Sequence, residues 1–356
     1  AGARQVIFKP YKKKAWFLIS FEKGARIAML DARTLKPAGK LHAPKPITSI
    51  TAGSDAEDPF VYVSYGWSAA GSCFHVGSGE RVGDLPVEGS EIVASASGEY
   101  VYARSLGVSP TGFDCYRRRI DAQTGVPQWT KVFDKHDDAG QYVPDPFGRY
   151  CAVGSQVRTS DLAEQVAKLD FVPDCFLRTR PAMVGVTPNG RVRAASYNTF
   201  KTFATLDLPA GMAPQPQRDH WRPRFDPPPL VCLPDNANER VVVAGRAQLA
   251  PLTMKQLKIP DEPVLVCEVT GPDRLAVGRA ASLTVKPLDR SCKIRLKDGP
   301  KGAQYDDGAL TWTPQEDQVG PAEVVLELSG GDVKVDQTVK LNVVRPLVEL
   351  PICPGG

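Results

Sequence analysis

Hydrophobic positions recur in a two-strand pattern through the first 260 residues of the chain. In each copy a short apolar run, a turn rich in Gly, Pro, Asn or Asp, and a second run with aromatic residues follow one another. Short apolar runs bounded by such turn residues predict β-hairpins. The predicted hairpins cover six stretches: residues 6–20, 47–64, 92–103, 142–153, 183–195 and 230–243.

A second motif follows several of these hairpins. Residues 31–34 read Asp-Ala-Arg-Thr and residues 121–124 read Asp-Ala-Gln-Thr, while residues 75–80 and 159–164 occupy the corresponding places. Successive copies are about 40–45 residues apart, which is the spacing of four-stranded propeller blades. We therefore predict an all-β fold that begins with a β-propeller over residues 1–260. Six blades are counted, and a seventh, from residues 210–228 or from outside this chain, is left open.

The pattern changes at the Pro-Asp-Glu-Pro stretch of residues 260–263. Residues 261–345 carry turns about 8–12 residues apart, which is typical of a β-sandwich. Strands are predicted near residues 265–269, 281–286, 293–297, 309–313, 322–329 and 333–344. Residues 346–356 are interpreted as a linker into a further domain.

Two regions resemble known families. The Leu-Thr-Trp-Thr-Pro strand at residues 310–314 and the Val-Gly turn at residues 319–320 resemble the bacterial putative-immunoglobulin, or dystroglycan-type cadherin-like, domain. The Pro-Phe-Gly-Arg-Tyr hairpin at residues 146–150 resembles those of the YVTN-type bacterial propellers. The combination is similar to large planctomycete multidomain proteins and, more loosely, to the bacterial membrane-coat-like proteins. The resemblance implies an immunoglobulin-like β-sandwich after the propeller.

Composition agrees with a globular β protein. Hydrophobic residues make up 42% and charged residues 24% of the chain, and the 31 glycines and 32 prolines supply many turns. The net charge of +4 is too small for a dedicated nucleic-acid binder. The eight cysteines form no C-x-x-C pair, so a zinc knuckle is not expected, and one or two disulfides are left open.

No arrangement of residues predicts catalysis. The four histidines include His136 and His220 beside aspartates, yet no His-x-x-x-His or Gly-x-Ser-x-Gly spacing occurs. The acidic stretches at residues 55–58 and 306–307 suit turns better than calcium sites. We therefore predict no catalytic, cofactor-binding or metal-binding residues.

Basic clusters are the clearest signal for a partner. Arg117 and Arg119 are predicted to share one face of a strand while Arg118 takes the other. An amphipathic Trp in a basic, Pro-rich stretch at residues 209–229 is a further candidate. The predicted interaction surface consists of Lys12, Lys13, Lys14, Arg117, Arg119, Arg218, Trp221, Arg222 and Arg224.

These observations favour a non-catalytic protein-interaction scaffold that is a fragment of a larger multidomain protein. One alternative is a peripheral membrane or coat-like component that binds anionic surfaces. Another is an accessory module of a secreted or envelope-associated enzyme. The protein partner and the localisation are left open, with the envelope, periplasm or membrane favoured over the cytoplasm.

Overall fold

The computed structural model describes most of the chain, which divides into two units. The described residues are 3–22, 24–66, 70–87, 91–105, 112–121, 123–136, 140–187, 189–208, 212, 230–235, 239–245, 248–272 and 274–346. Unit 1 comprises Ala1–Arg178, Ala182–Ser196 and Phe200–Ile259, and unit 2 comprises Thr179–Pro181, Tyr197–Thr199 and Pro260–Gly356.

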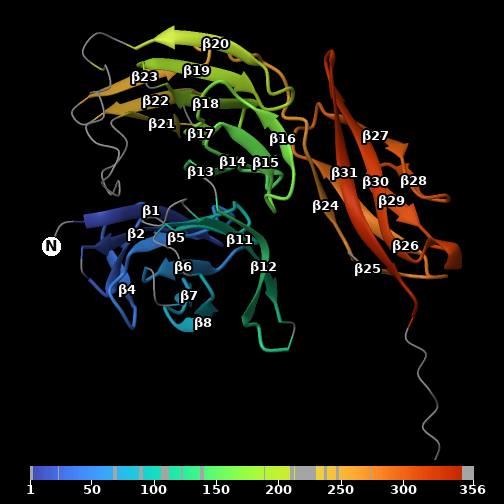
Figure 1. The fold of residues 1–356 in the computed structure, drawn as a ribbon, viewed down its shortest axis with the longest axis horizontal. Helices are drawn as coiled ribbons and strands as arrows, with labels where there is room; N and C mark the ends of the chain where they lie inside the picture. Colours follow the sequence, from blue (N-terminus) through green and yellow to red (C-terminus); the bar gives the residue numbers. More distant parts are fainter. Residues whose placement is uncertain are drawn as a thin grey trace, which may run out of the picture. The chain divides into compact units, whose positions relative to one another are not determined.

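Unit 1 contains six antiparallel sheets whose strands follow sequence order (Figure 1). The first three sheets hold β1 (Ala3–Tyr11), β2 (Lys14–Phe21), β3 (Arg26–Asp31) and β4 (Pro37–His42); β5 (Ser49–Thr51), β6 (Phe60–Ser64), β7 (Gly71–His75) and β8 (Arg81–Leu85); and β9 (Glu91–Ala94), β10 (Tyr100–Ser105), β11 (Gly112–Ile120) and β12 (Pro127–His136). The other three hold β13 (Tyr142–Pro144), β14 (Tyr150–Val153), β15 (Gln156–Thr159) and β16 (Gln165–Lys168); β17 (Cys175–Phe176), β18 (Ala182–Val186), β19 (Arg191–Ser196) and β20 (Thr202–Asp207); and β21 (Leu230–Asp235), β22 (Arg240–Gly245) and β23 (Leu249–Thr253).

The first strands of successive sheets lie side by side, in the order β1, β5, β9, β13, β17 and β21. Consecutive meander sheets joined through their first strands are the arrangement of a β-propeller, so we call the sheets blades 1 to 6. The prediction of an all-β fold with a β-propeller is confirmed, and the described residues form six blades. The sixth sheet has three strands instead of four. Of the stretch 210–228 that was considered for a seventh blade, every residue but Met212 lies outside the described residues.

The repeated Asp-x-x-Thr motif forms the same turn in different blades. The Asp31 carboxylate accepts hydrogen bonds from the backbone N–H of Thr34 at 2.7 Å and from its hydroxyl at 2.9 Å. Asp121 accepts the two equivalent bonds from Thr124 at the same distances. In blade 2 the ring Nδ1 of His75 takes the place of the carboxylate and accepts from the Ser78 N–H at 3.1 Å.

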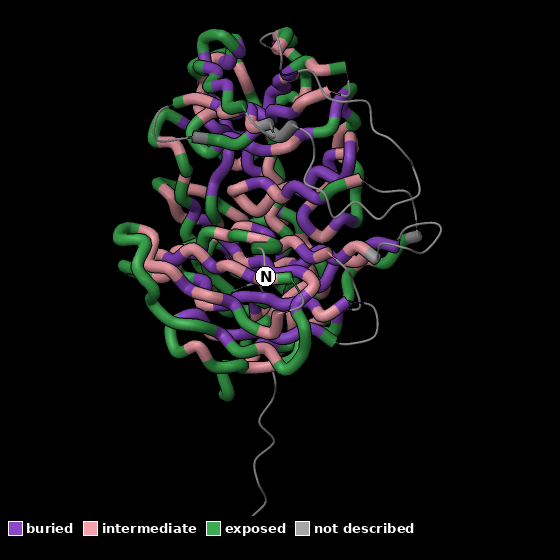
Figure 2. Tube along the Cα trace, turned by 90° about the vertical axis from the view of Figure 1, so that its left-hand side faces the viewer, coloured by how far each residue is buried: buried purple, intermediate pink, exposed green. Residues whose placement is uncertain are grey.

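Buried side chains join neighbouring blades. The Gln5 amide of β1 donates to the Ile50 carbonyl at 2.8 Å and accepts from the Ile50 N–H at 2.9 Å. The Thr51 hydroxyl accepts from the Ala94 N–H at 2.9 Å, across the next boundary. Such bonds satisfy backbone groups of first strands that have no strand neighbour on that side. Figure 2 shows buried segments running through the strands, with exposed ones at many of the turns.

A buried ion network links three blades. The Asp58 carboxylate lies 3.3 Å from the Lys9 ammonium of β1 and 2.5 Å from the Arg118 guanidinium of β11. The side chains of Lys9 and Asp58 are 0% and 2% exposed, and the Lys9 ammonium also donates to the Gly53 carbonyl at 2.8 Å. Burial lowers the pKa of Lys9, and the Asp58 charge opposes that effect. A Cβ at Gly98 would lie 2.4 Å from the Asp58 carboxylate, so only glycine fits there.

Unit 2 consists of two four-stranded sheets that share one core. Their orders are β24-β26-β29-β28 and β25-β31-β30-β27, and the core includes Leu283 and Leu310 from the first and Leu326 and Val343 from the second. Their bounds are β24 (Cys267–Thr270), β25 (Arg274–Ala276), β26 (Ala281–Pro287), β27 (Lys293–Asp298), β28 (Gln304–Asp306), β29 (Ala309–Trp312), β30 (Gly320–Gly330) and β31 (Val333–Val344), with a 3-10 helix η2 (Glu316–Gln318). The six predicted strands are present; the three-residue strands β25 and β28 were too short to predict.

We expect Asp58→Asn to destabilise unit 1 by about 3–5 kcal/mol, because it leaves two buried cations without their counter-charge. Urea unfolding measures the loss. Asp84→Asn is the control: its carboxylate is 69% exposed and pairs with Arg81, so the change should cost less than about 1 kcal/mol. An equal loss of unfolding free energy in the two variants would show that the buried network does not stabilise unit 1 more than an exposed ion pair does.

The Asp174 carboxylate joins blades 5 and 6. It accepts hydrogen bonds from the Val186 N–H at 3.0 Å and from the Cys232 N–H at 3.1 Å. Burial raises its pKa from 3.8 to about 6. Between about pH 4 and 6, Asp174 is therefore protonated in the folded state and ionised in the unfolded state. Stability should fall by about 2–3 kcal/mol as pH rises through this window. Asp174→Asn should flatten that part of the unfolding-versus-pH curve.

Candidate partner-binding site

A depression of about 910 Å³ lies at the end of blade 1, where three turns of blades 1 and 2 meet. We call it the lysine depression. Its cationic lining groups are Lys12, Lys13, Lys14, Arg33 and Lys40. Its apolar lining side chains include Phe8, Trp16 and Val76, so charged and hydrophobic groups face the same space.

The β1–β2 hairpin fixes the three consecutive lysines. Tyr11 pairs with Lys14, which leaves a two-residue turn of Lys12 and Lys13. Lys12 adopts a left-handed backbone with φ of 52°, and its N–H donates to the Ala56 carbonyl of blade 2 at 2.7 Å. Its ammonium lies 5.2 Å from the centre of the Tyr11 ring. Two residues before Tyr11, buried Lys9 holds the same hairpin against blade 2.

The lysine depression is strongly positive. Lys12, Lys13, Lys14 and Lys40 are exposed, and none forms an ion pair with a carboxylate in the described part of the chain. Asp31 is the one carboxylate among the lining residues. The hydrogen bonds from Thr34 lower the pKa of Asp31, so it stays ionised. Five cations therefore face one carboxylate, and that carboxylate already accepts hydrogen bonds from its own turn.

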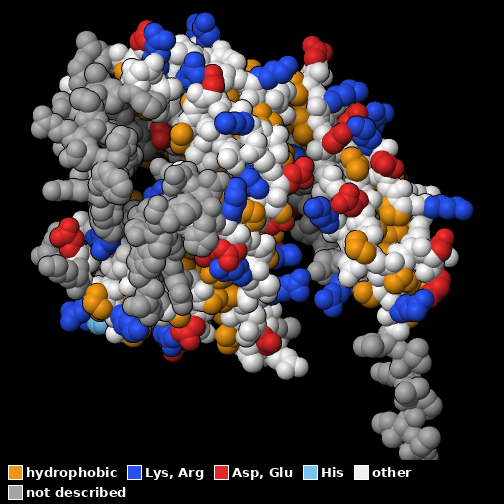
Figure 3. Space-filling view, viewed as in Figure 1, with side chains coloured by type: hydrophobic (Ala, Val, Ile, Leu, Met, Phe, Trp, Pro, Cys, Tyr) orange, Lys and Arg blue, Asp and Glu red, His pale blue; other side chains and the backbone are white. Residues whose placement is uncertain are grey.

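Exposed hydrophobic side chains occur on the same blade as these charges, and one of them, Phe8, lines the depression. Val6 and Phe8 of β1 are 55% and 53% exposed, and Leu35 in the β3–β4 turn is 62% exposed. Blade 1 thus carries three of the ten large apolar side chains that are exposed in the described part of the chain. In Figure 3, Lys and Arg side chains lie close to hydrophobic ones at the lower left of the view, over blade 1.

The structure brings together only part of the predicted interaction surface. Lys12, Lys13 and Lys14 line the depression, whereas Arg117 and Arg119 lie outside it, on β11 of blade 3. Arg117 pairs with Glu99 at 2.7 Å, and Arg118 on the opposite face joins the buried network. The remaining predicted residues, which are Arg218, Trp221, Arg222 and Arg224, lie outside the described residues.

Sequence reasoning missed Arg33, Lys40 and Leu35, which come from the β3–β4 region and not from a basic run. The available signal was topological. In an antiparallel meander the β1–β2 and β3–β4 turns fall at the same end of the sheet, so this topology brings charges in these two turns close together.

The described part of the chain contains no group of three or more His, Cys, Asp or Glu residues suited to a metal ion. The His75 ring accepts bonds from its own turn, His42 is exposed, and the side chains of His136 and His220 lie outside the described residues. Seven cysteines are free and buried. Burial raises the pKa of Cys73, Cys115 and Cys175, so these thiols are poor nucleophiles at neutral pH.

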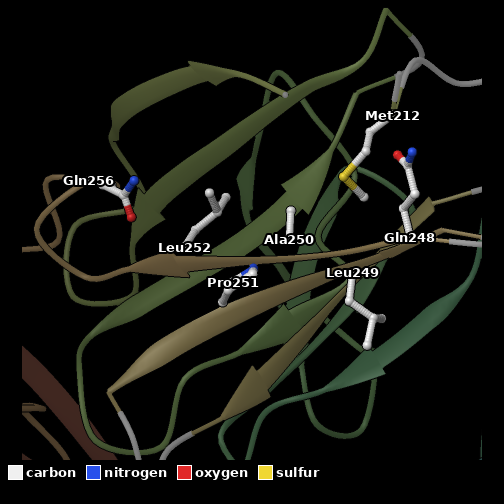
Figure 4. Close-up of a pocket in the computed structure, with 7 residues that line it drawn as sticks. All are labelled: Met212, Gln248, Leu249, Ala250, Pro251, Leu252 and Gln256. Carbon is white, nitrogen blue, oxygen red and sulfur yellow. The ribbon is translucent and has the colours of Figure 1, made fainter. Parts of the chain in front are cut away.

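A second depression, of about 570 Å³, lies beside β23 of blade 6 (Figure 4). Its polar side chains are Gln248 and Gln256, which lie at opposite ends of it. The other lining residues are Met212, Leu249, Ala250, Pro251 and Leu252. Its described lining residues include no titratable group for acid–base or nucleophilic chemistry.

No family model and no curated protein sequence matches the chain. Among solved structures, the chain is similar to the C-terminal WD40 domain of Sif2, with 8% identity, a TM-score of 0.44, and coverage of 92% of this chain and 78% of that one. It is also similar to the Neurospora crassa Pan2 WD40 domain, with 14% identity, a TM-score of 0.44, and coverage of 70% and 77%. The propeller assignment rests on the sheets described above. Within the described residues, no helix has the length and apolar character needed to cross a bilayer.

We expect the seven described thiols to resist alkylation in the folded protein at neutral pH, because all seven are buried. Mass spectrometry after iodoacetamide treatment, with and without denaturant, measures the difference. Rapid labelling of any of the seven in the folded protein would contradict the prediction.

Proposed function

We propose that this chain is a non-catalytic interaction scaffold whose lysine depression binds an acidic segment of a partner protein. The observation that carries the proposal is the gathering of four exposed lysines that lack carboxylate partners among the described residues. Other cations of the described structure pair with carboxylates, as Lys9 and Arg118 do with Asp58, and the lysine depression differs in gathering its exposed lysines in one place. Cations without counter-charges favour an anionic ligand and speed its approach.

An anionic membrane surface is the second candidate, since lysines near anionic lipid each contribute about 1 kcal/mol. The protein partner is favoured because the lysines line a concave site formed by three turns. A chain segment can enter such a site, whereas a planar bilayer contacts protruding groups.

We further propose that unit 2 is an immunoglobulin-like spacer and that the propeller is YVTN-type, in a fragment of a larger multidomain protein of the cell envelope. The motifs at residues 146–150 and 310–314 support this interpretation. An accessory role beside an enzyme domain is compatible with the same scaffold.

The test uses poly-L-glutamate and phosphatidylglycerol–phosphatidylcholine vesicles as separate probes at low salt. The triple variant Lys12→Glu, Lys13→Glu, Lys14→Glu should weaken poly-glutamate binding about tenfold or more, since each exposed ion pair contributes a few tenths to 1 kcal/mol. Added salt should weaken binding of the unmodified protein.

Lys168→Glu, Lys201→Glu, Lys255→Glu is the matched control, because these lysines are also exposed and the net charge changes equally. Equal weakening by both triple variants would show a general charge effect and refute the site. Binding to the vesicles alone would favour the membrane alternative.

A further inference from the structure

The outward face of blade 1 continues the lysine depression with apolar side chains. Along β1, Gln5 and Lys9 bond to blade 2, so the alternate residues Val6 and Phe8 point the other way. Phe8 pairs across the sheet with Phe17, with ring centres 5.7 Å apart. More than half of Val6 and of Phe8 is nevertheless exposed, and Phe8 also lines the depression.

Leu35 stands at a backbone position that suits glycine. Its N–H donates to the carbonyl of Asp31, four residues earlier, at 2.8 Å, with φ of 56°. The equivalent turns of blades 2 and 3 place Gly79 and Gly125 there, with φ of 78° and 69° and bonds of 2.8 and 2.9 Å, whereas blade 5 places Phe200 there with φ of 58° and a bond of 2.8 Å. A side chain is strained in this left-handed region. Leu35 is 62% exposed and comes two residues after Arg33, which lines the lysine depression, so it presents an apolar side chain near this site where glycine would be the less strained residue.

We propose that the lysine depression recognises an acidic segment that also carries apolar side chains. Carboxylates of the segment contact Lys12, Lys13, Lys14 and Lys40, and its apolar side chains cover Phe8 and Leu35. The proposal rests on the proposed function and adds the chemistry of the partner. Apolar contacts supply affinity that charge alone does not, because exposed ion pairs are weak.

Charge complementarity selects this occupant over a second copy of the chain. A two-fold contact between two copies of this face would bring lysines against lysines. Like charges across an interface are unfavourable. Asp31, the one carboxylate of the lining, is already engaged by its own turn. A segment rich in Asp and Glu brings no like charges to the lysines and supplies the carboxylates that the depression itself lacks.

The experiment compares two fluorescent peptides of equal length and charge: one of Glu with interspersed Leu and Phe, the other of Glu with Ser at those places. Anisotropy titrations against the full chain at low salt measure affinity. The apolar peptide should bind roughly tenfold more tightly, which is the effect of burying about one large apolar side chain.

Leu35→Gly is the decisive variant, because glycine suits the φ of 56° and the fold should be unchanged or more stable. It should weaken the apolar peptide about three- to tenfold and leave the serine peptide unaffected. Phe8→Ser should act in the same way. Leu249→Ser is the control, since Leu249 is 71% exposed on blade 6, and it should change neither affinity.

The outcomes separate the two proposals. Equal binding of both peptides would overturn the apolar recognition and leave the acidic site in place. Binding of neither peptide, nor of poly-glutamate, would refute the proposed function itself. Sedimentation that shows a dimer of the unmodified chain, lost in Leu35→Gly, would replace the acidic segment with a second copy as the occupant.

Discussion

The buried carboxylate of Asp58 pairs with two cations that come from different sheets, Lys9 of β1 and Arg118 of β11. Each of these charges would be costly to bury alone, and the three together are tolerated because every ion has a close partner. Tyr62 of the blade between them adds a hydroxyl that accepts from Arg118 and donates to the Gly98 carbonyl at 3.0 Å. The relative placement of blades 1, 2 and 3 is therefore fixed by directional bonds as well as by apolar packing.

The candidate site depends on this network. Lys9 is buried and Lys12 is exposed, yet both belong to the same hairpin, and the blade 2 loop that carries Gly53 and Ala56 bonds to both. The loop thus holds the turn that presents the three consecutive lysines. Binding side chains on an anchored turn lose less conformational entropy on binding than those on a free one. In the proposed site, the buried charges hold the exposed charges in place.

Local features of the fold could be predicted from sequence, and long-range pairings could not. The Asp-x-x-Thr turns form from residues three positions apart, so the repeats at Asp31 and Asp121 were visible in the chain. Lys9 and Asp58 are 49 positions apart, and nothing local identifies one as the partner of the other. The stretch 55–58 was interpreted as a turn, with calcium as the alternative, whereas its last carboxylate binds an ammonium and a guanidinium. The run of three lysines was easily found, but Arg33, Lys40 and Leu35 join it only through sheet topology.

The sheet edge of blade 6, at the other end of the blade series, is poorly suited to binding a partner by strand addition. Blade 6 has three strands, and a β-sheet edge ordinarily invites another strand. Pro251 of β23 has no N–H to offer, and the Thr253 N–H is already bonded to the Gln256 side chain at 2.8 Å. Strand addition needs a row of unpaired backbone donors and acceptors, and this edge has lost part of that row. The groups that blade 1 offers at the proposed site are side chains, so recognition there would depend on the charge and apolar area of the lysine depression.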